Sequence, residues 1–256
     1  MATKKKPAKK KPAQKKAAPA AKKKAAPKKA KAKATTTTTA EPRFLPEGRA
    51  FLKELARRQD REWFAPRKEE FKALLEEPMR ALVTGLGPLL LDTFPAVEDA
   101  TPKVFRIYRD TRFAKDKSPF KNHVAGELSL GRVGFYVHVG VDDAFAAVGM
   151  WQMEPDALKR YRANLVDNDA VGDALLKETQ ALEKKGFKLM SFDELTRAPT
   201  GVSPDHPRIQ LLKHKGWAVA LPMADVDVAA GGLPAVLAAK VRQTSKAIAL
   251  FEKALG

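Results

Sequence analysis

The chain has 256 residues, enough for one sizeable hydrophobic core or two small ones. Its formal net charge is +18, and fifteen of these charges are lysines within residues 1–40, which contain no acidic residue. Residues 41–256 therefore carry only +3 and are mildly basic. Cysteine is absent, which excludes disulfides, thiolate metal sites and thiol nucleophiles and is typical of a reducing compartment.

The first 42 residues differ in composition from the rest of the chain. They consist almost entirely of Lys, Ala, Pro and Thr, so they have little apolar surface to bury and are predicted to be disordered. The segment resembles the Lys/Ala/Pro-rich arms of linker histones and of some bacterial nucleoid proteins. Polylysine attracts phosphates without reading bases. We therefore expect residues 1–40 to bind DNA, RNA or another polyanion without sequence preference; the alternative is a solubilising extension.

The same segment argues against export. A secretory signal needs an apolar run behind its charges, and the longest candidate, Ala17–Ala21, is short and interrupted by Pro19. Organelle presequences are usually rich in Arg and Ser, and residues 1–40 contain neither. We expect a cytoplasmic protein without membrane contact, and the basic tail extends this expectation to association with the nucleoid.

The folded domain is predicted to span residues 43–256 and to begin with helices. The apolar spacing in Phe51–Leu55 behind Pro46 predicts a first helix that ends near Arg58. Two further helices are predicted over residues 66–76 and 78–86, after a polar turn that contains Trp63 and Phe64.

Residues 103–121 are predicted to begin as a strand and to continue as a polar loop. Side chains alternate along Val104–Asp110, so Phe105, Ile107 and Arg109 share the predicted core face. A guanidinium on an apolar face needs a carboxylate partner, and Pro119 keeps the loop out of a helix. Charged residues of both signs are concentrated here: Arg106, Arg109, Asp110, Arg112, Asp116, Lys117 and Lys121.

Three further strands are predicted over residues 124–130, 135–141 and 144–151, with Gly- and Asp-containing turns between them. With residues 104–110 they make an antiparallel sheet of four or more strands. His138 falls on the less apolar face of its strand. No second histidine lies two or four residues away, so we interpret His138 as structural rather than as a metal ligand.

The last third of the chain is predicted to be mainly helical, with one more strand. The predicted elements are helices that begin at residues 154 and 169, the second ending at Gly186, an irregular loop over 196–207, a short helix over 209–214, a strand over 217–221 and a closing helix over 234–254. The whole pattern predicts a single α+β domain over residues 43–256, in which helices from both ends of the sequence cover the antiparallel sheet.

The charged stretch carries a resemblance to a known family. The run Arg106-x-x-Arg109-Asp110-x-Arg112-Phe113, followed by Asp116-Lys117-x-Pro119 and Lys121, resembles the signature of a bacterial and fungal family of domains of unknown function. Trp63-Phe64, Gly149-x-Trp151, Arg197-Ala-Pro-x-Gly201 and Asp205-His206-Pro207 are similar to its other landmarks, so the resemblance covers residues 46–221. Phe120 stands where the family usually has tyrosine. The resemblance implies a shared fold and site, without a reaction.

The residues of the charged stretch predict an anion site. Arg106, Arg109 and Arg112 offer bidentate forks, while Lys117 and Lys121 offer point charges, the combination that holds phosphates or carboxylates. Prolines keep both this loop and the loop over 196–207 extended, so we expect the two loops to meet at a sheet edge and form one site. The expected ligand-binding set is completed by Asp116 and Arg197, and the candidate catalytic residues are His206, the adjacent Asp205, and Asp110.

Other chemistries have weaker support. The sequence contains no phosphate-cradling glycine loop, no His-Glu-x-x-His and no Gly-x-Ser-x-Gly, and we expect no cofactor and no metal. Asp110, Asp116, Glu127 and His206 are the residues that a hard cation would use, but the neighbouring cations would neutralise the carboxylates first.

Three functions stay open. The domain binds an anionic compound, with or without a reaction; it is a nucleic-acid accessory protein; or the Arg/Asp motif is an ionic network that orders the loop and buries Phe113 and Pro119. Arginines that face an open cleft would favour binding, whereas paired and covered guanidinium groups would favour the ionic network.

Overall fold

The computed structural model describes residues 41–191, 193–223 and 228–256, which all lie in one compact unit, Thr39–Gly256. The tail predicted over residues 1–42 falls almost wholly outside this described part. Within it, six strands form a single sheet in the order β1-β2-β3-β4-β6-β5, and every neighbouring pair is antiparallel. The prediction of an α+β fold with an antiparallel sheet of four or more strands is confirmed.

The strands agree with the predicted meander, with two differences. The first predicted strand, residues 104–110, has only its beginning in the sheet, because the following residues leave the sheet edge as a narrow ribbon. The second difference is β5, a three-residue edge strand that was not predicted. The strands are β1 (Lys103–Val104), β2 (His123–Ser129), β3 (Gly134–Gly140), β4 (Ala144–Met150), β5 (Lys188–Met190) and β6 (Trp217–Leu221).

The N-terminal helices are α1 (Pro46–Arg58), α2 (Arg61–Phe64), α3 (Lys68–Phe71) and α4 (Glu77–Leu90). Trp63 and Phe64 belong to α2 rather than to a turn. The two helices predicted over 66–76 and 78–86 form one continuous rod, because a π-helical turn over Lys72–Glu76 joins α3 to α4. Pro78 follows closely after this π-helical turn, and its missing N–H removes one backbone hydrogen bond of the continuous helix at that point.

The C-terminal helices are α5 (Pro155–Asp167), α6 (Asp169–Lys184), α7 (Ile209–Lys213), α9 (Leu233–Gln243) and α10 (Ser245–Leu255). The closing helix, predicted as one element, is two helices that meet at Thr244. The side chain of Thr244 is buried and donates a 2.7 Å hydrogen bond to the carbonyl of Val241. α10 then packs against α5 and α6, with Tyr161 and Trp217 in contact with Phe251.

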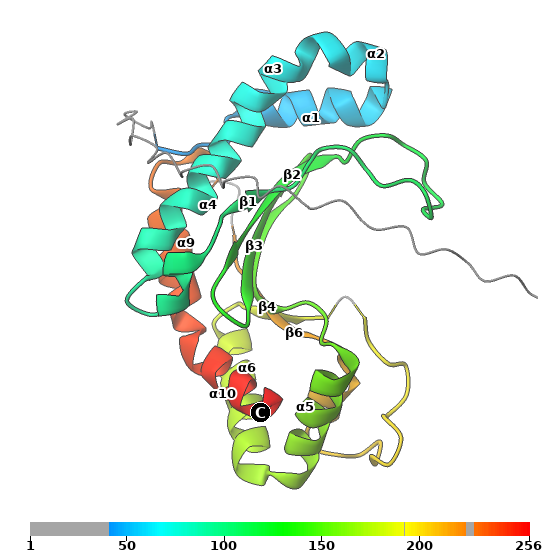
Figure 1. Cartoon of the computed structure of the whole chain (residues 1–256), viewed down its shortest axis with the longest axis vertical. Coiled ribbons are helices and arrows are strands. Elements are labelled where there is room, and N and C mark those ends of the chain that lie inside the picture. Colours follow the sequence, from blue (N-terminus) through cyan, green and yellow to red (C-terminus); the bar gives the residue numbers. More distant parts are fainter. Residues whose placement is uncertain (1–40, 192, 224–227) are drawn as a thin grey trace, which may run out of the picture. The chain divides into compact units, whose positions relative to one another are not determined.

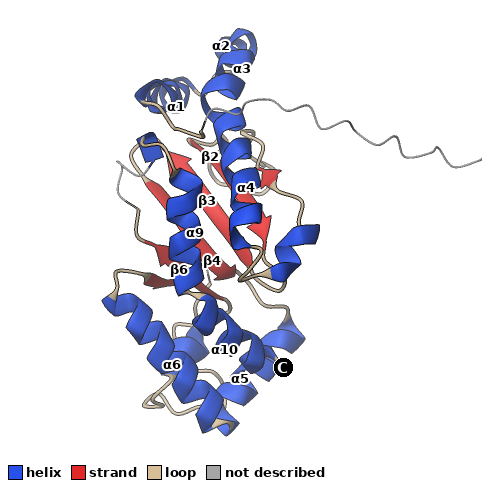
Figure 2. Ribbon diagram, turned by 90° about the vertical axis from the view of Figure 1, so that its left-hand side faces the viewer, coloured by secondary structure: helices blue, strands red, loops and turns tan. Residues whose placement is uncertain are grey.

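The sheet has two unlike faces. Helices α4 and α9 pack side by side on one of them (Figures 1 and 2). Across β2 and β3 this core face carries Val124, Leu128, Phe135, Val137 and Val139, all buried. Gly126 is also on the core face, and a Cβ there would lie 2.8 Å from Val83 Cγ1, so α4 rests directly on the backbone of β2.

The opposite face is not covered by a helix across β2 and β3 in the described part of the chain (Figure 1). We call it the open face. By the strand registers it carries Lys103, His123, Ala125, Glu127, Tyr136, His138, Phe145 and Ala147. Its aromatic residues are half-buried, while Ala125 and Ala147 beneath them are buried.

No helix within residues 41–191, 193–223 and 228–256 is long and apolar enough to cross a membrane.

Candidate functional site

The charged stretch forms a two-stranded ribbon that projects from the sheet edge beside α1 and α2 (Figure 1). Its two arms are joined by hydrogen bonds from Arg109 N to Pro119 O, 2.9 Å, and from Lys121 N to Ile107 O, 2.8 Å. Phe120 fixes the base of the ribbon, because it is fully buried with its ring 4.7 Å from that of Phe64. Phenylalanine suits this apolar position, where a phenol would lose its contact with water.

Two of the three arginines in the motif are paired within the ribbon. Arg109 Nη1 donates to Asp116 Oδ2 at 2.6 Å. Arg112 makes a bidentate pair with Asp110, with donor to acceptor distances of 2.7 and 3.0 Å. Lys117 donates to the carbonyl of Thr111 at 2.9 Å. Part of the motif therefore forms the ionic network that was considered as the third alternative in the sequence analysis.

These pairs order the tip of the ribbon more than they stabilise the fold. The Arg112 side chain is 76% exposed, and exposed ion pairs contribute about 0–1 kcal/mol each. The pKa of Asp110 is lowered first by the hydrogen bond from the Arg112 side chain. The pKa of Asp116 is lowered first by the backbone N–H of Ser118, and Arg109 adds to this effect.

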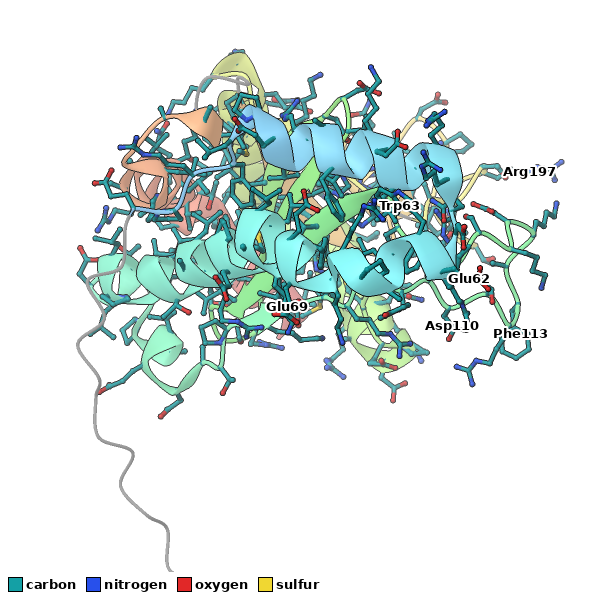
Figure 3. The ribbon with its side chains drawn as sticks, turned by 90° about the horizontal axis from the view of Figure 1, so that it is seen from above. Glu62, Trp63, Glu69, Asp110, Phe113 and Arg197 are labelled. Atoms are coloured by element: carbon teal, nitrogen blue, oxygen red, sulfur yellow. The ribbon has the colours of Figure 1, made fainter. Side chains whose placement is uncertain are left out.

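The third alternative also had the loop bury Phe113 and Pro119, and for Phe113 the structure contradicts it; Pro119 is partly buried. The side chain of Phe113 is 95% exposed, and Figure 3 shows it projecting outward at the tip of the ribbon. The contact of its ring is with a charged group, since the guanidinium carbon of Arg112 lies 5.9 Å from the ring centroid.

Arg106 and Lys121 differ from the paired cations. Within the described residues neither has a carboxylate at ion-pair distance. Lys121 Nζ lies 5.4 Å from the centroid of the Phe105 ring, and its pKa is lowered first by burial and then by the positive charges of Arg106, Arg109 and Lys103. The base of the ribbon, where it joins the open face, is therefore a positively charged region, which we call the cationic end.

A row of stacked rings begins next to the cationic end. The ring of His138 is 4.2 Å from that of His123 and 4.9 Å from that of Phe145, and both pairs are stacked. The row thus crosses β2, β3 and β4. Strand pairing brings His123 beside His138 from a neighbouring strand, a contact that the spacing of histidines in the sequence did not indicate.

Burial lowers the pKa of both imidazoles in this row. Burial lowers the pKa of His123 to about 4, and His138 and Lys121 lower it further. Burial also lowers the pKa of His138, against the opposing effect of Asp143, whose Oδ1 lies 3.4 Å from His138 Nε2. Gly140 leaves room for this pair, since a Cβ at Gly140 would lie 2.1 Å from Asp143 Oδ1.

A second group of rings surrounds a hollow beside the row. The cavity has a volume of about 320 Å³ and is lined by Phe105, Glu127, Tyr136 and Trp151. The Tyr136 ring is 6.0 Å from Phe105 and 5.7 Å from Trp151. Lys103 Nζ lies 3.1 Å from Glu127 Oε1 and 4.6 Å from the Phe105 centroid. The hollow is therefore lined by three aromatic rings and by one charged side chain, Glu127.

The loop that carries the predicted catalytic residues lies apart from the ribbon. His206 Nδ1 accepts a 3.1 Å hydrogen bond from the backbone N–H of Arg208. Arg208 in turn is buried and pairs with Asp169 and Asp173 of α6, both at 2.7 Å. Figure 1 shows the ribbon near α1 and this loop near α5, at different ends of the sheet.

Asp205 and Arg197 also remain with that loop. Both are exposed, and Figure 3 shows Arg197 extending outward. Among the described residues, no hydrogen bond or ion pair links residues 196–207 to residues 103–121. The structure therefore does not bring the two loops into one site, because a proline-rich loop can extend along the surface in any direction, and here the Arg208 ion pairs hold it against α6.

The carboxylates proposed for the alternative cation site are also dispersed. Asp110 and Asp116 pair with arginines, Glu127 pairs with Lys103, and His206 is on the other loop. In the described ranges, no group of three or more His, Asp or Glu side chains is arranged to hold a metal ion.

Comparison with known proteins gives the family. Residues 47–249 match the model described as conserved hypothetical protein (DUF2461). The chain belongs to this family. The resemblance to a family of unknown function is thus confirmed, and the DUF2461 match continues beyond the predicted landmarks into α9 and α10. No curated protein and no solved structure matches the chain.

The residues of the open face were missed by the motif-based analysis of the sequence. His123 and Tyr136 were not singled out there, and Phe105 was assigned to the core face, although strand alternation alone puts Tyr136 and His138 on one face. Extending the pairing through the Gly131–Gly134 turn would have placed His123 on the same face. The signal was present in the register of the hairpin rather than in any local motif.

Proposed function

We propose that this domain binds an anionic ligand, through a phosphate or carboxylate group, at the cationic end of the open face. The observation that carries the proposal is the charge imbalance there. Arg109 and Arg112 have carboxylate partners, whereas Arg106 and Lys121 have none within the described residues. The lowered pKa of Lys121 reflects burial and repulsion from its cationic neighbours, and a bound anion would relieve that repulsion.

Two further features support the same position. Arg109 Nε is buried without a hydrogen-bond partner in the described part of the chain, and an unsatisfied buried donor is costly unless a ligand or water accepts from it. Beside it lies His123, an imidazole kept neutral by its low pKa. A neutral imidazole can donate and accept hydrogen bonds, so His123 is our candidate for a polar contact to the ligand; a pKa of about 4 makes it a weak proton acceptor at neutral pH.

The test is anion-dependent stability of the full chain. Thermal unfolding is measured in phosphate and in chloride at equal ionic strength for the wild type, Arg106→Gln and Lys121→Gln. We expect phosphate to stabilise the wild type, by about 2.7 kcal/mol when its concentration is a hundredfold above the dissociation constant. The two variants should lose most of this stabilisation. Binding to residues 1–40 does not enter the comparison, because all proteins carry the same tail.

Arg112→Gln and Lys117→Gln are the matched controls, because both residues lie in the same ribbon but have partners there. They should keep the phosphate effect. The proposal is wrong if phosphate stabilises the wild type no more than chloride does, or if the control variants lose as much stabilisation as Arg106→Gln and Lys121→Gln.

A second function is supported by a separate observation, the fifteen lysines of residues 1–40. In this alternative the protein is a nucleic-acid accessory protein associated with the nucleoid, and the Arg109–Asp116 and Arg112–Asp110 pairs serve only to order the ribbon. The tail would then supply non-specific affinity through phosphate neutralisation. The two functions are compatible, since they use different parts of the chain.

A further inference from the structure

The hollow on the open face lies directly beside the cationic end. Phe105 belongs to both, because its ring lines the cavity while Lys121 Nζ lies 5.4 Å from the ring centroid. A ligand with its anionic group at Lys121 therefore has the hollow within reach. At about 320 Å³, the cavity is at the small end of the range of small-molecule sites, about 300–1,000 Å³.

The lining of the hollow suits a flat ring. Tyr136 is tilted by 54° to Phe105 and by 78° to Trp151, so the three rings surround the space rather than stacking on one another. Aromatic walls of this kind bind planar groups by stacking and edge contacts.

Glu127 supplies the polar contact. Its Oε1 accepts from Lys103, while its second carboxylate oxygen has no hydrogen bond within the described residues. A carboxylate oxygen can accept from the amino or ring N–H groups of a nucleobase.

We propose that the ligand of the open face is a nucleoside phosphate, with its base in the hollow formed by Phe105, Tyr136 and Trp151 and its phosphate at Arg106 and Lys121. This inference rests on the proposed function for the phosphate end and adds the identity of the rest of the ligand.

Two other occupants fit less well. A nucleic-acid strand crossing the sheet needs repeated phosphate contacts. The open face of β3, β4 and β6 carries Tyr136, His138, Phe145 and alanines, and the next cation across the sheet is Lys188 of β5, beside Ala220. A quaternary ammonium ion favours aromatic cages, but here the ammonium groups of Lys103 and Lys121 already lie within 5.4 Å of the Phe105 centroid. They would repel a third cation.

Calorimetric titration of the full chain tests the inference with AMP, CMP, GMP and UMP, with ribose 5-phosphate as the ligand that lacks a base. We expect at least one nucleotide to bind about tenfold or more tightly than ribose 5-phosphate, since stacking of a base contributes about 1–3 kcal/mol. Phe105→Leu should remove most of this difference, lowering the affinity for the nucleotide more than the affinity for ribose 5-phosphate, because its ring forms one wall of the hollow. Phe113→Leu, which alters an exposed ring outside the hollow, should change neither.

The outcomes separate the two proposals. If ribose 5-phosphate binds through Lys121 and no nucleotide binds more tightly, the base subsite is wrong and the anion site stands. If neither binds, both are wrong. Tighter binding of phosphocholine than of any nucleotide would assign the hollow to an ammonium group and overturn the inference. The inference would also be overturned if a single-stranded oligonucleotide bound far more tightly than its mononucleotides and the Phe105→Leu variant lost that additional affinity.

Discussion

At the scale of single residues, the site depends on which charges lack partners. Arg109 and Arg112 attracted attention in the sequence because they lie in a dense motif, yet both are paired with carboxylates in the ribbon. Arg106 and Lys121, at the two ends of the same motif, have no such partner among the described residues. Spacing in a sequence identifies a group of ionic residues, but only side-chain geometry shows which of them retain an uncompensated charge.

The lowered pKa of His123 predicts how the free energy of unfolding depends on pH. The pKa of His123 is about 4 in the folded protein and 6.5 for an unperturbed histidine, so the unfolded chain binds a proton in a range where the folded chain does not. Acidification therefore favours the unfolded chain. The free energy of unfolding keeps its full value, as far as His123 is concerned, above pH 6.5 and falls as the pH is lowered from 6.5 to 4.

We expect the difference to be on the order of 1 kcal/mol, after allowing for solvent screening at a half-buried group. Urea unfolding of the wild type and of His123→Gln at pH 7 and pH 4.5 measures it, because His138, His214 and the carboxylates contribute to both proteins. The wild type should lose more stability on acidification than the variant. Equal losses would contradict a depressed pKa at His123.

At the scale of elements, the sequence was informative wherever one face is buried. Alternation along β2 and β3 predicted both strands within one or two residues, since their core faces are continuously apolar. β5 escaped prediction because Lys188–Met190 is a three-residue edge strand, too short to show a period. In the strand predicted over 104–110, Ile107 is buried and Arg106 is exposed as expected. Phe105, which was predicted on the core face with Ile107, instead lines the hollow of the open face, because the chain leaves the sheet after Val104 and pairs with the other arm of the ribbon.

The packing of α4 on β2 gives a prediction for the core face. A Cβ at Gly126 would lie 2.8 Å from Val83 Cγ1 and 3.1 Å from Met79 Sδ, and Val83 has little freedom to move away. Gly126→Ala should therefore lower the free energy of unfolding by about 1–3 kcal/mol. Chemical denaturation of this variant measures the effect.

Gly134→Ala is the control, because Gly134 is also a strand glycine but a Cβ there meets nothing within 4 Å. Its stability should stay within about 0.5 kcal/mol of the wild type. Adding Val83→Ala to Gly126→Ala should relieve the clash, so the double variant should be less destabilised than the sum of the two single variants. Strict additivity would show that α4 does not press on β2 at this point.

At the scale of the whole molecule, the fold class could be predicted and the composition of the site could not. Helices near both ends of the domain and a hairpin meander between them were enough for an α+β domain with an antiparallel sheet. To predict the site, one would have to know that β2 and β3 bring His123 beside His138. One would also have to know that Arg208 holds the loop of His206 at α6. Both depend on pairings between residues distant in sequence, which local patterns do not specify.

The last prediction concerns residues 1–40 and their fifteen lysines. Deleting them should remove most of the affinity for DNA and RNA at low salt. It should also flatten the dependence of binding on salt, because each neutralised phosphate contributes about −0.9 to the slope of log K against log salt on duplex DNA. Fluorescence anisotropy with duplex and single-stranded probes over a range of salt concentrations measures both quantities.

A variant with the order of residues 2–40 permuted and their composition kept is the matched control. Smeared positive charge does not depend on order, so this variant should bind like the wild type and show the same slope. The deletion variant should keep its stabilisation by phosphate, which shows that the domain remains folded. Equally tight binding by the deletion variant would mean that the domain itself, with only +3 of the formal charge, contacts the nucleic acid. The open face would then be the first surface to mutate.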